Sequence, residues 1–173
     1  NIGKYDTPDS LDKILNETLD YWESLYGTRS AETTLALRFA GVVGRAYEQS
    51  GERVAILIDE YDKPLLQAIG NEELQREFCN TLKPFYGVLK TMDGCIKFAL
   101  LTGVTKFGKV SVFSDLNNLN DISMDEPFIS ICGITEKEIH LNFEEDLHEL
   151  AAAQKMTYQE VCNELKACYD GYH

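Results

Sequence analysis

The stretch RVAILIDEYDKP, from Arg53 to Pro64, decides the fold that we predict for this chain. Its first part, Val54 to Ile58, is an unbroken apolar run rich in β-branched side chains, which is typical of a strand buried on both faces of a parallel sheet. The run stops at two carboxylates, Asp59 and Glu60. We therefore expect both acids at the carboxyl end of a strand, the edge at which open α/β sheets bind their ligands.

A second apolar run, residues 95–103, supports this interpretation because it ends in the hydroxyl of Thr102. Between the two runs, apolar side chains recur at helical spacing on one face, at Leu74, Phe78, Leu82, Phe85 and Leu89. Strand, helix and strand in this order form a βαβ unit, whose handedness places both strand ends on one edge of the sheet. We expect Thr102 within reach of Asp59 and Glu60.

An Asp-Glu pair at a strand end is the Walker B arrangement of nucleotide triphosphatases. The Asp holds Mg²⁺, usually through water, and the Glu activates the attacking water, while Thr102 takes the place of a sensor-1 residue. Lys106, in the glycine-containing loop after Thr102, is a candidate phosphate contact. The residues leave simpler interpretations open: the acids end a strand and cap a turn, and Lys106 is a solvated loop lysine.

The predicted fold class is α/β, with a partial P-loop NTPase-type three-layer core and a parallel sheet over residues 1–132. Before the acidic pair we predict two amphipathic helices. The first begins at the cap Thr7 and ends near Gly27, and the second is capped by Ser30. A last short strand is predicted at residues 128–132.

Residues 133–173 are predicted to form a small helical lid or the start of a following helical region. Thr135 and Thr157 are each followed three residues later by a Glu, the pattern of a capping box in which each side chain bonds the other residue's backbone. His140 and His148 lack the spacing of a paired metal-ligand set, so we expect surface or boundary roles for both.

Composition limits the classes of function. The formal net charge of −13 disfavours a duplex-binding surface, which needs clustered Lys and Arg. No apolar run approaches the roughly 20 residues that span a bilayer, and no signal segment opens the chain, so we expect a cytoplasmic protein without a membrane partner. The five scattered cysteines have no CxxC spacing, which indicates reduced thiols and disfavours a zinc site.

Four stretches carry a family resemblance: AILIDEYDKP at residues 55–64, FALLTGVTKF at 98–107, FSDLNNLND at 113–121 and YDGYH at 169–173. In this order they resemble the AAA-ATPase-like family of bacterial proteins, in which a P-loop ATPase region precedes a nuclease-like domain of the restriction-endonuclease superfamily. The resemblance covers essentially the whole chain. It implies Mg²⁺ and ATP as cofactor and ligand, with Asp59 associated with Mg²⁺, Glu60 activating water and Thr102 as the sensor.

The chain departs from the family pattern at the phosphate-binding loop. No Gly-x-x-x-x-Gly-Lys-Ser/Thr occurs, and Gly3-Lys4 is followed by Tyr5. We therefore expect a fragment of a larger protein that supplies an amino-terminal Walker A segment and a carboxyl-terminal nuclease-like domain, the latter a route to nucleic acid. Because the loop makes most phosphate contacts, the fragment alone should hold Mg·ATP weakly or not at all.

Three functions stay open. The first is an ATPase in the full parent chain, with the isolated fragment inactive and a homo-oligomer as a possible assembly. The second is a phosphatase with an aspartate nucleophile, which is weakened because Tyr61 stands two residues after Asp59, where such enzymes place an acid-base Asp. The third is a non-catalytic nucleotide-fold scaffold for protein association. The sequence assigns no role to residues 117–121 or 169–173.

Overall fold

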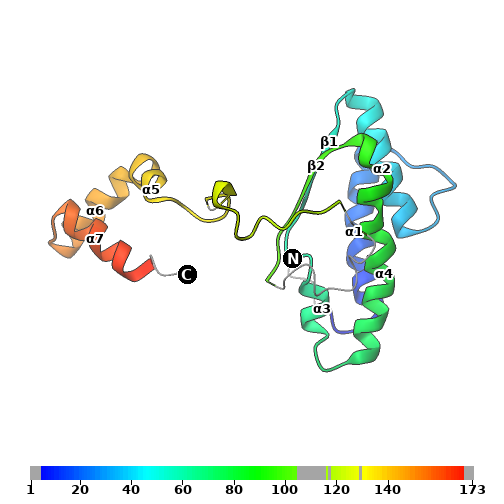
Figure 1. Cartoon of the computed structure of the whole chain (residues 1–173), viewed down its shortest axis with the longest axis horizontal. Helices are drawn as coiled ribbons and strands as arrows, with labels where there is room; N and C mark the ends of the chain where they lie inside the picture. Colours follow the sequence, from blue (N-terminus) through cyan, green and yellow to red (C-terminus); the bar gives the residue numbers. More distant parts are fainter. Residues whose placement is uncertain (1–4, 105–115, 117, 129, 170–173) are drawn as a thin grey trace. The chain divides into compact units, whose positions relative to one another are not determined.

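The computed structural model describes residues 5–104, 116, 118–128 and 130–169. The chain divides into two compact units, residues 1–120 and 121–173. The elements of the first unit are, in chain order, α1 (Pro8–Tyr26), α2 (Leu35–Ser50), β1 (Val54–Ile58), α3 (Lys63–Gln67), α4 (Glu72–Thr91), η1 (Asp93–Cys95) and β2 (Ile96–Leu101) (Figure 1).

The two strands form a parallel pair, as the sequence predicts. Val54 pairs with Ile96 and Ile58 with Leu101, so both strands end at the same edge. The connection from β1 to β2 runs through α3 and α4, which confirms the predicted βαβ unit. The chain is therefore a mixed helix and strand structure with a partial α/β core. The third layer of the predicted P-loop-type core is not among the described elements.

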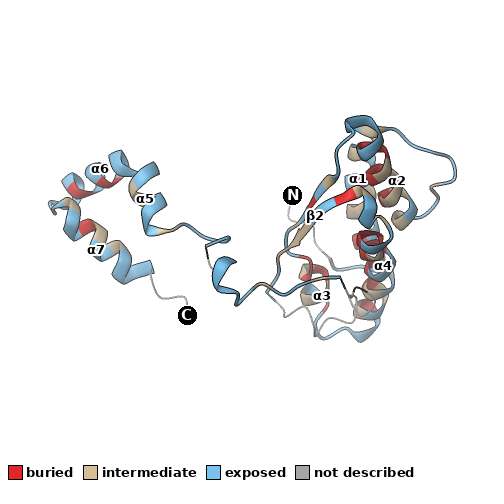
Figure 2. Ribbon diagram, turned by 45° about the horizontal axis from the view of Figure 1, so that its top comes forward, coloured by how far each residue is buried: buried red, intermediate tan, exposed pale blue. Residues whose placement is uncertain are grey.

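The hydrophobic core of the first unit lies where α1, α2 and α4 pack together and against one face of the strand pair. Figure 2 shows buried residues along α2 and α4. The rings of Phe39 and Phe85 stack with centroids 4.7 Å apart, and Trp22 stacks on Phe39 at 6.1 Å. These contacts join all three helices. Ile56 of β1 and Ile96 of β2 bring the sheet into the same core.

The opposite face of the strand pair is open, which corrects the prediction that β1 is buried on both faces. Leu57 is 71% exposed and Phe98 of β2 is 51% exposed. The apolar run correctly predicted a strand. Among the described residues, however, helices cover only the face that carries Ile56.

The start of α2 also differs from the prediction. Ser30 does not cap the helix; the cap is Thr34, whose hydroxyl accepts a hydrogen bond from the Leu37 N–H at 3.3 Å. Tight turns occupy the residues between, because the Glu32 N–H donates to the Arg29 carbonyl at 3.0 Å. The helix begins only after these turns. By contrast, α1 begins after Thr7 and is followed by Gly27, as predicted, but the Thr7 side chain makes no capping hydrogen bond.

The second unit is helical. Its elements are η4 (Glu126–Phe128), α5 (Glu136–Asn142), α6 (Glu144–Gln154) and α7 (Tyr158–Tyr169), and its small core holds Leu147, Ala151 and Val161. Both predicted capping boxes are present, at Thr135 with Glu138 and at Thr157 with Glu160. The assignment of this unit as a lid stays a prediction. Among the described residues, no helix has the length and hydrophobicity needed to cross a bilayer.

The strand predicted at residues 128–132 is wrong. Pro127 lies within η4, and the Ile131 N–H donates to the Phe128 carbonyl at 2.9 Å. The residues described on either side of position 129 thus close on themselves in turns. Their backbone groups bond locally and do not pair with a neighbouring strand.

The caps of α5 and α7 make the second unit sensitive to acid. Hydrogen bonds from the Thr157 backbone and hydroxyl hold the pKa of Glu160 below its usual range. A carboxyl with a lowered folded-state pKa contributes stability at neutral pH that is lost as the pH falls through that pKa. Gln fits the same capping position but does not titrate.

We therefore predict that Glu160→Gln flattens the acid dependence of amide-exchange protection in the first turn of α7. In the unsubstituted chain, protection should fall as the pH drops below the usual Glu range. Glu164→Gln, the same change later in α7, should leave the dependence as it was. An unchanged acid dependence in Glu160→Gln would show that this carboxyl does not control the start of the helix.

A buried ion pair fastens the α1–α2 connection to α2. Arg45, with a side chain 7% exposed, donates to the Glu32 carboxylate, whose side chain is 11% exposed. The Nε and Nη2 atoms of Arg45 have no hydrogen-bond partner among the described residues, so the Glu32 carboxylate is the group that neutralises this buried charge. Gly41 leaves room for the carboxylate, because a methyl group there would lie 2.1 Å from Glu32 Oε1.

We predict that Glu32→Gln lowers the free energy of unfolding by about 3 kcal/mol, because it leaves the Arg45 charge buried without a counter-charge. The matched control is Glu48→Gln, which breaks an Arg29–Glu48 pair whose side chains are 63% and 62% exposed. That change should cost less than about 1 kcal/mol. Urea denaturation measures both, and equal losses would contradict the assignment.

Candidate functional site

The candidate site lies where β1 and β2 end. Asp59 and Glu60 follow β1 directly, and Thr102 follows β2. Backbone hydrogen bonds continue beyond the strands: the Thr102 N–H donates to the Ile58 carbonyl at 2.9 Å, and the Tyr61 N–H donates to the Thr102 carbonyl at 2.9 Å. The structure therefore brings Asp59, Glu60 and Thr102 together on one edge. Their chemical roles remain predictions.

The Thr102 hydroxyl links the two strand ends. It donates a hydrogen bond to Asp59 Oδ1, and it lies 3.4 Å from the Glu60 backbone N–H as an acceptor. This arrangement fixes the Asp59 carboxylate beside the hydroxyl. Carboxylate and hydroxyl oxygens are hard ligands of the kind that Mg²⁺ takes together with water and phosphate oxygens.

Glu60 has a partner that sequence reasoning missed. Its carboxylate forms an ion pair with Lys63. The hydrogen bond to Glu60 raises the pKa of the Lys63 ammonium. The i,i+3 spacing of these two residues was the available signal, but only the turn into α3 brings the side chains together.

Glu60 also has an unusual backbone. Its φ of 54° lies in the left-handed region, which non-glycine residues seldom adopt. Lys155, the other non-glycine residue described with a positive φ, follows the last turn of α6, where such a conformation is common. Glu60 has no such helix-end explanation, and strained residues of this kind cluster at functional sites.

A family model described as "Predicted AAA-ATPase" matches residues 1–113, which include the whole strand-end site. The chain belongs to this AAA-ATPase-like family. An "uncharacterized protein in vnfD 5'region" of Azotobacter chroococcum mcd 1 is 38% identical over 163 residues. That match covers 94% of this AAA-ATPase-like chain and 30% of the relative, so the chain spans under a third of the relative's length. No solved structure matches.

Other predicted site residues of the AAA-ATPase-like chain fall outside the described part. Lys106 lies there, as do Asn117 and residues 170–173. Two described leucines of the Asn-rich motif, Leu116 and Leu119, pack in the core of the first unit. These positions have a packing role that the motif alone did not reveal.

No group of three or more His, Cys, Asp or Glu side chains that could hold a metal ion occurs in the described part of the AAA-ATPase-like chain. All five cysteines are free thiols. A Mg²⁺ at Asp59 would take one carboxylate from the described residues. Its other ligands would be waters and phosphate oxygens, which is a usual ligand set for this ion.

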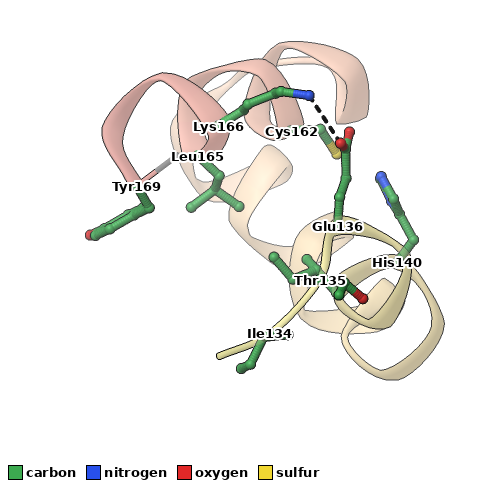
Figure 3. A pocket seen from close by; sticks show the side chains of 9 residues that line it. Ile134, Thr135, Glu136, His140, Cys162, Leu165, Lys166 and Tyr169 are labelled. Carbon is green, nitrogen blue, oxygen red and sulfur yellow. Dashed lines mark hydrogen bonds and ion pairs between the residues drawn. The ribbon is translucent and has the colours of Figure 1, made fainter. Parts of the chain in front are cut away.

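Two surface recesses lie elsewhere. One of about 270 Å³ lies between α1, α2 and β1, and one of about 420 Å³ lies between α5 and α7. Figure 3 shows the Glu136–Lys166 ion pair beside Cys162 in the larger recess. His140 also lines it and bonds the Tyr158 hydroxyl at 2.7 Å. These polar groups are paired with one another within the second unit. We therefore interpret the recess as a gap left by the packing of α5 and α7.

The left-handed backbone at Glu60 is testable by comparing two substitutions. Glu60→Ala and Glu60→Gly both remove the carboxylate and its ion pair, but only Gly avoids the Cβ penalty at positive φ. We predict that the Gly variant is the more stable of the two by about 1 kcal/mol in urea denaturation.

The control for this prediction is Glu48 within α2, where Gly should instead be less stable than Ala by about 1 kcal/mol. The same order of stability at both positions would mean that Glu60 is not held in the left-handed region in solution.

Proposed function

We propose that this chain carries the acidic pair of an ATPase and takes part in Mg²⁺-dependent hydrolysis of ATP in the full natural protein. Membership of a family described as predicted AAA-ATPases supports the proposal. The observation that carries it is the contact of the Thr102 hydroxyl with Asp59 at the ends of two parallel strands, next to Glu60. Such edges are where ligands bind in open α/β sheets.

Each residue has a proposed task. Asp59 holds Mg²⁺, largely through water, and the bound ion neutralises charge on the phosphate oxygens. Glu60 orients the attacking water and takes its proton. Thr102 keeps the Asp59 carboxylate in place through its hydroxyl, and Lys106 contacts a phosphate. To accept a proton, Glu60 needs an oxygen that Lys63 does not hold.

The resemblance extends the proposal to the rest of the natural protein. The match to a relative more than three times as long as the matched region leaves room for further domains. We infer a Walker A segment that completes the phosphate site and a nuclease-like domain that would meet nucleic acid. Residues 133–173 would act as a lid. On this view the isolated chain binds Mg·ATP weakly.

A second candidate is a non-catalytic scaffold with a nucleotide fold. The ion pair between Glu60 and Lys63 favours it, because the Lys63 ammonium occupies Oε2 of the Glu60 carboxylate and leaves only the other oxygen to meet a water. In that case the natural protein would bind ATP without turning it over.

The deciding experiment is Mg²⁺-dependent ATP hydrolysis by the full natural protein at saturating nucleotide. We predict that Glu60→Gln lowers turnover on the order of a hundredfold, because it removes the general base, while ATP binding is retained. The control is Glu52→Gln, the same change before the other end of β1, which should leave turnover unchanged. Binding without turnover in the unsubstituted protein would favour the scaffold.

A further inference from the structure

Directly after the exposed acids, the chain turns into the core. Tyr61 is 6% exposed and Asp62 is 2% exposed, so Asp62 is among the most deeply buried side chains described. Burial of a carboxylate is costly unless the carboxylate has a partner, and Asp62 is not without one. Asp62 precedes α3, but its side chain makes no capping hydrogen bond to that helix. Helix capping therefore does not explain its burial.

The Asp62 carboxylate packs against the loop that follows β2. A methyl group built on Gly103 would lie 2.7 Å from Asp62 Oδ1 and 2.7 Å from Tyr61 Cε1. Cβ atoms do not approach other atoms so closely, so only glycine fits without a shift of the loop or of the buried side chains. The backbone of Gly103 is thus held against two buried residues.

Further contacts fix the other side of this arrangement. The Tyr61 carbonyl accepts a hydrogen bond from the Tyr86 hydroxyl of α4 at 3.3 Å, and Tyr86 is itself buried. The Tyr61 N–H holds the Thr102 carbonyl at 2.9 Å. Two contacts therefore hold the backbone around Thr102. Its carbonyl accepts the hydrogen bond from Tyr61, and the next residue, Gly103, packs against Tyr61 and Asp62.

We propose that Asp62 and Gly103 are positioning residues whose close packing, the Asp62/Gly103 contact, holds the Thr102 hydroxyl on Asp59. This inference rests on the proposed function, since Thr102 matters to turnover only if the strand-end site is catalytic. Asp62 acts by packing against the backbone of Gly103, the residue after Thr102, and it touches no reacting atom. A displacement of about 1 Å at such a site is enough to cost on the order of a hundredfold in rate.

The first test is Gly103→Ala in the full natural protein. The added methyl should displace the loop, and kcat for ATP should fall on the order of tenfold to a hundredfold. KM should change by less than about threefold, because the change misorients reacting groups and removes no binding contact. Gly87→Ala in α4 is the matched control: no atom lies within 4 Å of its added methyl, and kcat should not change.

The second test couples the two residues. Asp62→Ala leaves a gap beside Gly103 and should also lower kcat. Adding Gly103→Ala to that variant should then cost less than Gly103→Ala costs alone, because the methyl no longer meets the carboxylate and clashes only with Tyr61 Cε1. If the kcat losses of the two single variants multiply in the double variant, the two residues act independently and the proposal is overturned.

A readout that needs no hydrolysis separates this inference from the proposed function. In Gly103→Ala, and independently in Asp62→Ala, amide exchange at Tyr61 should quicken by about tenfold or more while exchange inside β1 is unchanged. An inactive natural protein with this exchange pattern would remove the ATPase proposal and leave the Asp62/Gly103 contact in place. Turnover in the natural protein with unchanged exchange in both variants would overturn the contact alone.

Discussion

Parallel hydrogen bonding between β1 and β2 is the constraint from which the first unit follows. Parallel strands cannot be joined by a tight turn, so the chain must leave the end of β1 and return to the start of β2. It does so through α3 and the long helix α4, whose inner face then fills the core against α1 and α2. The register that sets Ile58 opposite Leu101 also brings Asp59 and Thr102 within hydrogen-bonding distance.

Much of this was predictable because it depends on local periodicity and one general rule. Apolar runs ending in polar residues predicted the strands, helical spacing predicted α4, and the handedness of βαβ units predicted that Asp59 and Thr102 would meet. The Lys63 ion pair and the burial of Asp62 depend on how the chain turns after β1. Tertiary packing decides that turn, and the sequence pattern carries little sign of it.

The wrong predictions have a common cause. Ser30 is as good a capping residue as Thr34, and residues 128–132 are as apolar as a strand. In each case a non-local or turn-forming contact decided the outcome: the Glu32–Arg45 pair beside α2, and the turns around Pro127. Likewise, the apolar composition of β1 predicted a strand buried on both faces, but it did not show which elements would pack on the second face.

The open face of the strand pair exposes apolar surface to solvent. Leu57 and Phe98 present apolar side chains on one face of the strand pair, and an exposed apolar surface favours association. A negatively charged chain resists this by mutual repulsion, and salt weakens that repulsion. We therefore expect low ionic strength to keep the purified chain dispersed and added salt to favour its association.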